Sequence, residues 1–466
     1  MSHQIAGSSS AAKISPALAG ERGRWLALFV VLLATFMDLV DVTIVGVALP
    51  SIQRDLHGGY AFGQWIVAGY ALSYAVVLVT GGRLGDIFGP RRIFMVGVAG
   101  FSVASAVAGA AVSPGMLVAA RVMQGLFGGI MVPQVMSVVA TRFTPGRDRT
   151  LALSLYGLLL GVAQVSGPIL GGLLTSYDWR LIFYINIPVG VLAIIGAARW
   201  MDEHTQAGAV RLDLPGVALL TAAALLLTFP LVQGRERGWP AWSLVMLGAA
   251  PFALVLFGWY ERRRRGPALV PMGLFRSRSF TAGLILMLVL FTGISIYFIT
   301  LTWRLQFGLG WSPLHVALTG LAWPAGIACT AQLSYRLSAR RGRLLVLTGM
   351  PITALATAGL AWAQPHSASF MPWMFGGGVG MGLTIPILST LVITDIGAGD
   401  AGAASGVLNS VVQLGSAIGV ALAGVVYFAG PAAQTRTFSV AAGIFLFAGC
   451  LASLLPPHTH EYDSPV

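Results

Sequence analysis

Two aspartates three residues apart, Asp38 and Asp41, interrupt an apolar run that extends from Trp25 to Pro50. On a helix this spacing places both carboxyl groups on one face. A carboxylate near the middle of a bilayer costs about 3 kcal/mol on insertion scales. Apolar surroundings and a second carboxylate both favour the protonated form, so the pair is a candidate site for taking up and releasing a proton. The structural alternative is that one aspartate caps the backbone of a broken helix.

One arginine, Arg121, also lies inside an apolar run, at residues 115–140. A buried guanidinium needs a partner, and its donors suit a carboxylate or backbone carbonyls. Arg121 lies near the outer end of this run, at the limit from which an arginine reaches the interface by snorkelling. Two interpretations therefore stand, a functional partner for a carboxylate and a snorkelling side chain.

The elements that carry these charges are apolar helices. The chain is 56% hydrophobic and 9% charged, with a mean hydropathy of +0.81, whereas a soluble domain is about 25% charged. Apolar runs long enough to cross a bilayer recur from end to end, which predicts an all-α polytopic membrane protein. The fourteen expected spans are 25–49, 60–81, 93–112, 115–140, 150–174, 181–200, 213–232, 240–260, 280–302, 312–335, 344–363, 371–394, 403–428 and 437–455.

The distribution of basic residues predicts the orientation, because short cytoplasmic loops collect arginine and lysine. With the N-terminus inside, the inward segments hold 21 of the 28 basic residues and the outward segments hold 6, while Arg121 lies within a span. An even number of spans then places both termini in the cytoplasm. The net charge of +12 is explained by this topology, and we expect no nucleic-acid partner.

A weak internal repeat suggests two related halves. RLGDIFGPRR (83–92) follows the second span and RLSARRGRLL (336–345) follows the tenth. If spans 1–6 and 9–14 are related, spans 7 and 8 are an inserted pair. The expected organisation is a disordered N-terminal tail at 1–24, a six-helix bundle at 25–200, two inserted helices with linkers at 201–270, a second six-helix bundle at 271–456 and a cytoplasmic tail at 457–466.

Several stretches together resemble the major facilitator superfamily, and within it the fourteen-helix drug:proton antiporters. GGRLGDIFGPRR (81–92) resembles the loop signature between spans 2 and 3, with Pro90 before its arginine pair. RVMQGLFGGIMVP (121–133), GVAQVSGPILGGLL (161–174) and DVTIVGVALP (41–50) are similar to the signatures of spans 4, 5 and 1. DWRLIFYINIPVG (178–190) and AGAASGVLNSVVQLGSAIGVAL (401–422) resemble the spans 6 and 13 of that family.

The resemblance implies a major facilitator fold with alternating access, export from the cytoplasm and exchange for protons. Asp41 and Arg121 match family positions for proton coupling, whereas Asp38 is an addition to the usual pattern. Whether one carboxyl group titrates or two is left open. The loop signature implies a gating latch formed by Gly82, Asp86, Gly89, Arg91 and Arg92. The antiporter signature of span 5 comprises Gly161, Gly167, Pro168, Gly171 and Gly172, whose physical role is close helix packing and a bend.

Polar residues of the central spans are candidates for the lining of a substrate pocket. Arg304, in LTWRLQFGLGWSP (301–313), departs from the family, and it either snorkels to the headgroups or lines the outer exit. The candidates are Gln124, Gln164, Arg304, Asn409 and Gln413.

The sequence thus predicts a proton-coupled antiporter that exports amphipathic drugs or antibiotics. The alternative is export of one endogenous metabolite, amino acid or lipid by the same mechanism. We expect a monomer in the cytoplasmic (inner) membrane that uses protons as the coupling ion and has no cofactor or metal. No span carries a metal-ligand pair, a nucleophile with its base or a phosphate loop, so an intramembrane enzyme is not favoured. A receptor or scaffold would have no need of two buried aspartates.

Overall fold

The computed structural model describes residues 21–143, 146–203, 213–264, 272–393, 401–427 and 432–454. Within these ranges the regular structure is helical and contains no strand. Fourteen helical stretches of the described chain are long and apolar enough to cross a membrane, in agreement with the fourteen predicted spans. The chain is therefore an all-α, multi-pass membrane protein.

The first six spans are built from eight helices, because a break at Pro133 and another at Ile185 each divide one span in two. Proline lacks the backbone N–H that would continue the helix through the break before it. Helix α1 packs on α6 and α8, and both α2 and α3 pack on α4. The helices are α1 (Glu21–Asp55), α2 (Tyr60–Phe88), α3 (Pro90–Gly109), α4 (Pro114–Met131), α5 (Pro133–Arg142), α6 (Arg147–Tyr177), α7 (Leu181–Tyr184) and α8 (Asn186–Trp200).

Glycines bring α2 and α4 into close contact. A Cβ added at Gly125 would lie 2.3 Å from the carbonyl oxygen of Tyr70, and one at Gly81 would lie 2.4 Å from the carbonyl oxygen of Gly129. Small residues at such positions let helix backbones approach closely in a membrane. Because Arg121 lies one turn before Gly125, this packing fixes the depth and direction of its side chain.

The last six spans form a second bundle, in which α13 continues from within the predicted span 312–335, through the segment after it, into the predicted span 344–363. Glycines again bring backbones together, since a Cβ at Gly378 of α14 would lie 2.0 Å from the carbonyl oxygen of Trp323 in α13. The elements are η1 (Met272–Arg276), α11 (Arg278–Trp303), the π-helical η2 (Arg304–Gly308), α12 (Pro313–Gly320), α13 (Ala322–Leu360), α14 (Ser367–Ile393), α15 (Ala401–Tyr427), α16 (Ala433–Leu451) and η3 (Ala452–Leu454).

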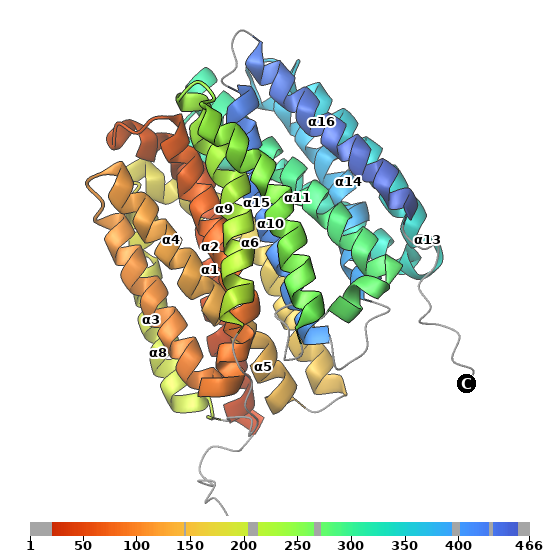
Figure 1. The fold of residues 1–466 in the computed structure, drawn as a ribbon. Coiled ribbons are helices and arrows are strands. Elements are labelled where there is room, and N and C mark those ends of the chain that lie inside the picture. Colours follow the sequence, from red (N-terminus) through yellow and green to blue (C-terminus); the bar gives the residue numbers. More distant parts are fainter. Residues whose placement is uncertain are drawn as a thin grey trace, which may run out of the picture.

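Helices α9 (Leu214–Glu236) and α10 (Ala241–Arg263) form a hairpin between the two bundles in the sequence. In Figure 1 they are the green helices in front of α2 and α15, and α9 contacts both. The ring of Phe229 in α9 lies 5.8 Å from that of Trp65 in α2 and 5.6 Å from that of Trp242 in α10. The inserted pair is therefore held against both halves of the molecule.

A polar cluster joins the start of α9 to the C-terminal end of α10. Asp213, just before α9, accepts hydrogen bonds from the Gly216 amide (3.0 Å), the Tyr260 hydroxyl (2.9 Å) and Arg264 (2.5 Å). Burial raises the pKa of the Asp213 carboxyl group, but the hydrogen bonds with Gly216, Glu261 and Tyr260, together with the Arg264 charge, outweigh it and bring the pKa below its usual value.

The two bundles meet mainly along two helix pairs, α2 with α15 and α6 with α12, and α1 also contacts α11 and α12. The amide Nε2 of Gln64 donates to the carbonyl oxygens of Val420 and Ala421, both at 3.0 Å. Nε2 of Gln306 donates to the carbonyl oxygen of Val47 at 2.7 Å. These contacts lie toward the end of α1 and the start of α2, on the side that the arginine distribution predicts to face outward. The bundles are thus in contact at that end, and the hydroxyl of Ser410 in α15 also donates to the carbonyl oxygen of Ala75, farther along α2, at 2.9 Å.

Candidate functional site

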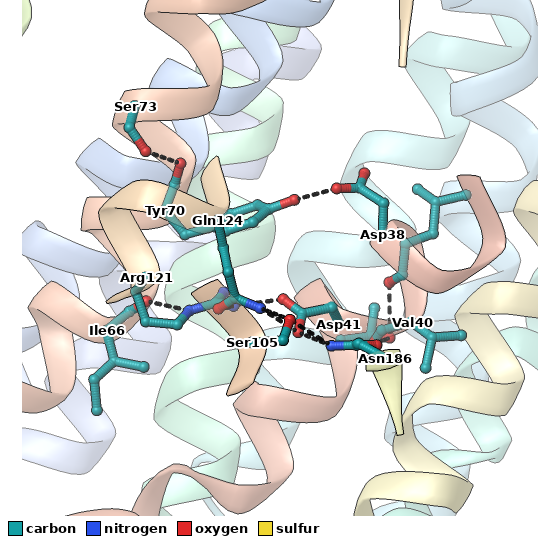
Figure 2. A network of polar contacts seen from close by, with 12 residues as sticks. Asp38, Val40, Asp41, Ile66, Tyr70, Ser73, Ser105, Arg121, Gln124 and Asn186 are labelled. Atoms are coloured by element: carbon teal, nitrogen blue, oxygen red, sulfur yellow. Dashed lines mark hydrogen bonds and ion pairs between the residues drawn. The ribbon is translucent and has the colours of Figure 1, made fainter. Parts of the chain in front are cut away.

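The carboxylate of Asp41 lies at the centre of a polar network between helices α1, α3, α4 and α8 (Figure 2). Its Oδ2 atom accepts a hydrogen bond from Nη1 of Arg121, and both side chains are buried. Its Oδ1 atom accepts from Nδ2 of Asn186 at 2.9 Å and from Nε2 of Gln124 at 3.2 Å. A buried charge is tolerated when it is paired and hydrogen-bonded in this way.

The donors of Arg121 are directed to three acceptors in different helices. Nη1 donates to Asp41 and also to Oε1 of Gln124 at 2.8 Å, while Nε donates to the carbonyl oxygen of Ile66 at 3.1 Å. The guanidinium carbon lies 4.4 Å from the centre of the Tyr70 ring, a geometry that adds a cation–π interaction. The side chain is 1% exposed. Arg121 is therefore engaged inside the bundle and does not snorkel.

Asp38 lies one turn before Asp41 on α1 and is also buried, with 2% of its surface exposed. Its Oδ1 atom accepts a hydrogen bond of 2.6 Å from the hydroxyl of Tyr70. Neither aspartate caps a broken helix, because α1 is continuous and the hydrogen bonds to both carboxyl groups come from side chains of other helices. The two carboxyl groups thus share one face of α1 but have different surroundings.

Three members of this network were not identified from the sequence. Asn186 stands in the quoted stretch DWRLIFYINIPVG, where an amide in an apolar span was a signal that could have been used. Ser105 accepts hydrogen bonds from Gln124 (2.7 Å) and Asn186 (3.2 Å), and Tyr70 bonds to Asp38. A serine or tyrosine in an apolar helix is too common to be distinguished without the fold.

The predicted latch spans a very short connection, since α2 ends at Phe88 and α3 begins at Pro90. Gly89 adopts φ +94°, a conformation that favours glycine. Nη2 of Arg91 donates to the carbonyl oxygen of Ala198 at 2.6 Å, and Nε of Arg92 lies 3.6 Å from a carboxylate oxygen of Glu203. Both arginines therefore contact the C-terminal end of α8 and the residues after it. The side chain of Asp86 lies outside the described part of the structure.

The other predicted latch residue, Gly82, has a looser environment: a Cβ there would lie 3.7 Å from the Cβ of Pro133 in α5, an ordinary contact.

The span-5 signature lies on α6, where Pro168 is inside the helix. A Cβ at Gly167 would lie 1.7 Å from Oγ1 of Thr43, and one at Gly171 would lie 3.0 Å from the carbonyl oxygen of Ile44. Both glycines therefore face α1, one turn beyond Asp41. Gly172 instead faces the second bundle, since a Cβ there would lie 2.8 Å from Cα of Leu314 in α12.

Gly161 differs from the other glycines of this signature, because a Cβ added there would have no neighbouring atom within 4 Å. The predicted close packing thus holds for Gly167, Gly171 and Gly172 but not at Gly161.

The predicted pocket residues are separated by the fold. Gln124 belongs to the Asp41 network, whereas Gln164 on α6 and Asn409 on α15 are exposed and Gln413 is half-buried. Arg304 donates from Nη1 to the carbonyl oxygen of Leu360 and from Nη2 to that of Ala363 at 2.9 Å. It thus binds the C-terminal end of α13 and the residues just after it.

The geometry supports a simple exchange chemistry. If Asp41 took up a proton, its charge would no longer hold the Arg121 guanidinium, and the hydrogen bonds that it accepts from Gln124 and Asn186 would weaken. Because these partners come from different helices, a change of protonation at Asp41 changes how α1, α4 and α8 are held together.

Comparisons with known proteins agree with this architecture. A sequence profile described as Major Facilitator Superfamily matches residues 31–420 and 283–465. The "Probable actinorhodin transporter" of Streptomyces coelicolor is 40% identical over 420 residues, covering 87% of this chain and 72% of that protein. The "Puromycin resistance protein pur8" of Streptomyces alboniger is 35% identical over 411 residues, with 86% and 81% covered.

Solved structures show the same fold. The nucleoside transporter NupG superposes with a TM-score of 0.64 at 9% identity, covering 93% of this chain and all of that chain.

The "Tetracenomycin C resistance and export protein" of Streptomyces glaucescens adds a further relative, 35% identical over 418 residues, with 87% of this chain and 76% of that protein covered. With its profile match, its fourteen spans and these relatives, the chain belongs to the major facilitator superfamily of transporters.

Proposed function

We propose that the protein is a proton-coupled antiporter that exports amphipathic drugs or antibiotics across the cytoplasmic membrane by alternating access. The observation that supports it best is the buried Asp41–Arg121 pair, with the second carboxyl group of Asp38 one turn away. A proton that binds Asp41 breaks a pair shared by several helices, so proton binding and helix rearrangement are linked. The names of the relatives, which include antibiotic resistance and export proteins, support the direction and the substrate class.

The arrangement of the two bundles fits one state of such a cycle. They contact each other at the predicted outward end through Gln64 and Gln306, which is the arrangement expected when a carrier accepts substrate from the cytoplasm. Protonation of the N-terminal bundle would then be the event that favours return to this state after substrate is released outside. The protein would act as a monomer, because one chain supplies both bundles.

A second candidate is a dedicated exporter of one compound by the same mechanism. It is favoured by relatives whose names each contain a single product, actinorhodin in one and tetracenomycin C in another. The two candidates share the proton site and differ only in the range of substrates. A panel of chemically unrelated compounds separates them: the first predicts accumulation of several, the second of one.

The proton mechanism is tested in proteoliposomes with an imposed pH gradient and a panel of fluorescent lipophilic cations. Asp41→Asn should abolish uphill accumulation, because a side chain that cannot ionise cannot exchange a proton. It should preserve exchange of labelled for unlabelled substrate without a gradient, since that exchange needs no net proton movement. Asp38→Asn measured in parallel shows whether one group or two takes part. Uphill accumulation that survives in the double variant would refute the proposal.

A further inference from the structure

Tyr70 contacts Asp38 directly and also contacts Arg121, the residue that binds Asp41. Its hydroxyl donates to Oδ1 of Asp38 at 2.6 Å, while the face of its ring lies 4.4 Å from the guanidinium carbon of Arg121. Arg121 in turn binds Asp41. Figure 2 shows the tyrosine between these two contacts, with its ring on the Arg121 side and its hydroxyl directed to Asp38.

The backbone of Tyr70 is held firmly. Its carbonyl oxygen accepts a hydrogen bond of 3.0 Å from the hydroxyl of Ser73, and Gly125 of α4 packs directly against the same carbonyl. The residue is 1% exposed. Only the ring can respond to its surroundings, and because a tyrosine ring is a rigid plane, the hydroxyl end cannot shift without moving the ring face.

We propose that Tyr70 is a positioning residue that couples Asp38 to the Asp41–Arg121 pair, a role that rests on the proposed function of Asp41. While Asp38 is ionised, the hydroxyl donates a charge-assisted hydrogen bond to it, and such bonds are stronger and shorter than neutral ones. When Asp38 is protonated, that bond weakens or reverses, because a phenol both donates and accepts. The ring face then changes its contact with the Arg121 guanidinium. Protonation of one carboxyl group therefore alters how readily the other takes up a proton.

A purely structural role makes a different prediction. If the hydroxyl only satisfies a buried carboxyl group and the ring only fills space, removing either lowers stability without altering how the two carboxyl groups influence each other. Coupling instead requires that a change at Tyr70 alter the response of the protein to a change at Asp41, a residue with which the Tyr70 hydroxyl has no hydrogen bond among those of the described residues.

The decisive variant is Tyr70→Phe, which removes the hydroxyl and keeps the ring under Arg121. Tyr70→Leu removes both contacts. Tyr297→Phe is a matched control from the second bundle, because Tyr297 is fully buried and its hydroxyl has no hydrogen-bond partner within the described structure. Each variant is measured in proteoliposomes with a lipophilic cation that the wild type accumulates, both with a pH gradient and in exchange without one.

Tyr70→Phe should reduce accumulation driven by the pH gradient by about tenfold to a hundredfold, the factor expected for a lost hydrogen bond to a charged group. Exchange without a gradient should stay close to the wild-type value. Tyr297→Phe should change both by less than about twofold, because its hydroxyl makes no bond to lose. Gradient-driven accumulation by Tyr70→Phe at the level of the Tyr297→Phe control would overturn the coupling role.

A second measurement needs no substrate. The melting temperatures of wild type, Tyr70→Phe, Asp41→Asn and the double variant form a cycle, and coupling predicts that the two single effects do not add. Additive effects would overturn the proposal.

The outcomes also separate this proposal from the function on which it rests. If Asp41→Asn still accumulates substrate uphill, the proposed function fails. If Asp41→Asn does not and Tyr70→Phe does, only the coupling role fails.

Discussion

The two six-helix bundles handle buried polar groups in different ways. In the N-terminal bundle, buried carboxylate, guanidinium and amide groups bond across helices, as Asn186 and Gln124 do to Asp41, while hydroxyls such as those of Thr35 and Ser73 bond their own helix. In the C-terminal bundle, buried hydroxyls mostly bond the backbone of their own helix one turn earlier. Examples are Thr357 to Thr353, Thr384 to Gly380 and Thr437 to Ala433, at 2.7–2.9 Å, while Thr292 bonds both Leu288 of its own helix and Gly415 of α15.

Ion pairs are also distributed unequally between the two bundles. Among the described residues every ion pair lies before residue 265, and the one between Asp41 and Arg121 is fully buried. A bundle whose polar partners come from several helices must rearrange when one of them changes charge. A bundle whose hydroxyls are satisfied locally is able to move as a rigid body. Under the proposed function, the N-terminal bundle is therefore the half that responds to the proton, and the C-terminal bundle moves relative to it as a rigid body.

The largest test of this contrast is Arg121→Leu. The substitution leaves the Asp41 carboxylate buried without its cation, and removing one partner of a buried pair typically costs about 3–5 kcal/mol. The purified variant should show a clearly lower melting temperature in detergent. Combining it with Asp41→Asn, which removes the orphaned charge, should recover part of the loss. A single variant as stable as the wild type would show that the pair is not essential to the bundle.

The corresponding test of the C-terminal bundle adds a methyl group where two helices are in close contact and leaves the charge unchanged. Gly378→Ala would place a Cβ 2.0 Å from the carbonyl oxygen of Trp323 and force α13 and α14 apart, at a typical cost of about 1–3 kcal/mol. Gly376→Ala is the matched control, since its Cβ would lie 3.6 Å from that of Ala356, an ordinary contact. We expect a lower melting temperature for the first variant alone. Equal melting temperatures would contradict close packing at this position.

Much of the N-terminal site was predictable from the sequence because charge in an apolar span is rare. Asp38, Asp41 and Arg121 stood out for this reason, and the three-residue spacing correctly placed the two carboxyl groups on one face of α1. Tyr70 and Ser105 could not be identified, since both residue types occur throughout apolar helices. Their roles depend on how α2 and α3 cross α4 and α1, and the sequence alone does not show this packing.

The fold shows the same limit. Hydropathy predicted the fourteen spans, because apolar length is a local property. It did not predict that α13 is helical through the connection between two spans, nor that Pro133 divides one span into α4 and α5. The side chain of Arg304 was assigned to the membrane surface or to the outer exit. Only the fold shows that the end of α13 supplies its acceptors.

The smallest expected effect is at Arg304. Arg304 lies in the C-terminal bundle between the rings of Phe370 and Phe438, 5.2 and 5.8 Å from its guanidinium carbon, and binds backbone carbonyls. Arg304→Lys keeps the charge but offers one compact donor group where there was a planar fork. The loss of about one hydrogen bond predicts a destabilisation of ~1 kcal/mol.

The same conservative change at Arg121 should behave differently, and the pair of variants isolates what each arginine does. Arg121→Lys also keeps the charge, but a lysine cannot reach Asp41, Gln124 and the Ile66 carbonyl together in the geometry of the guanidinium. Transport driven by a pH gradient should therefore fall sharply in Arg121→Lys and change little in Arg304→Lys, when both are measured in the same proteoliposomes. If Arg304→Lys altered the pH dependence as strongly as Arg121→Lys, the response to protons would be shared by both bundles, because an arginine that binds only carbonyls would then have to sense the charge of the opposite half.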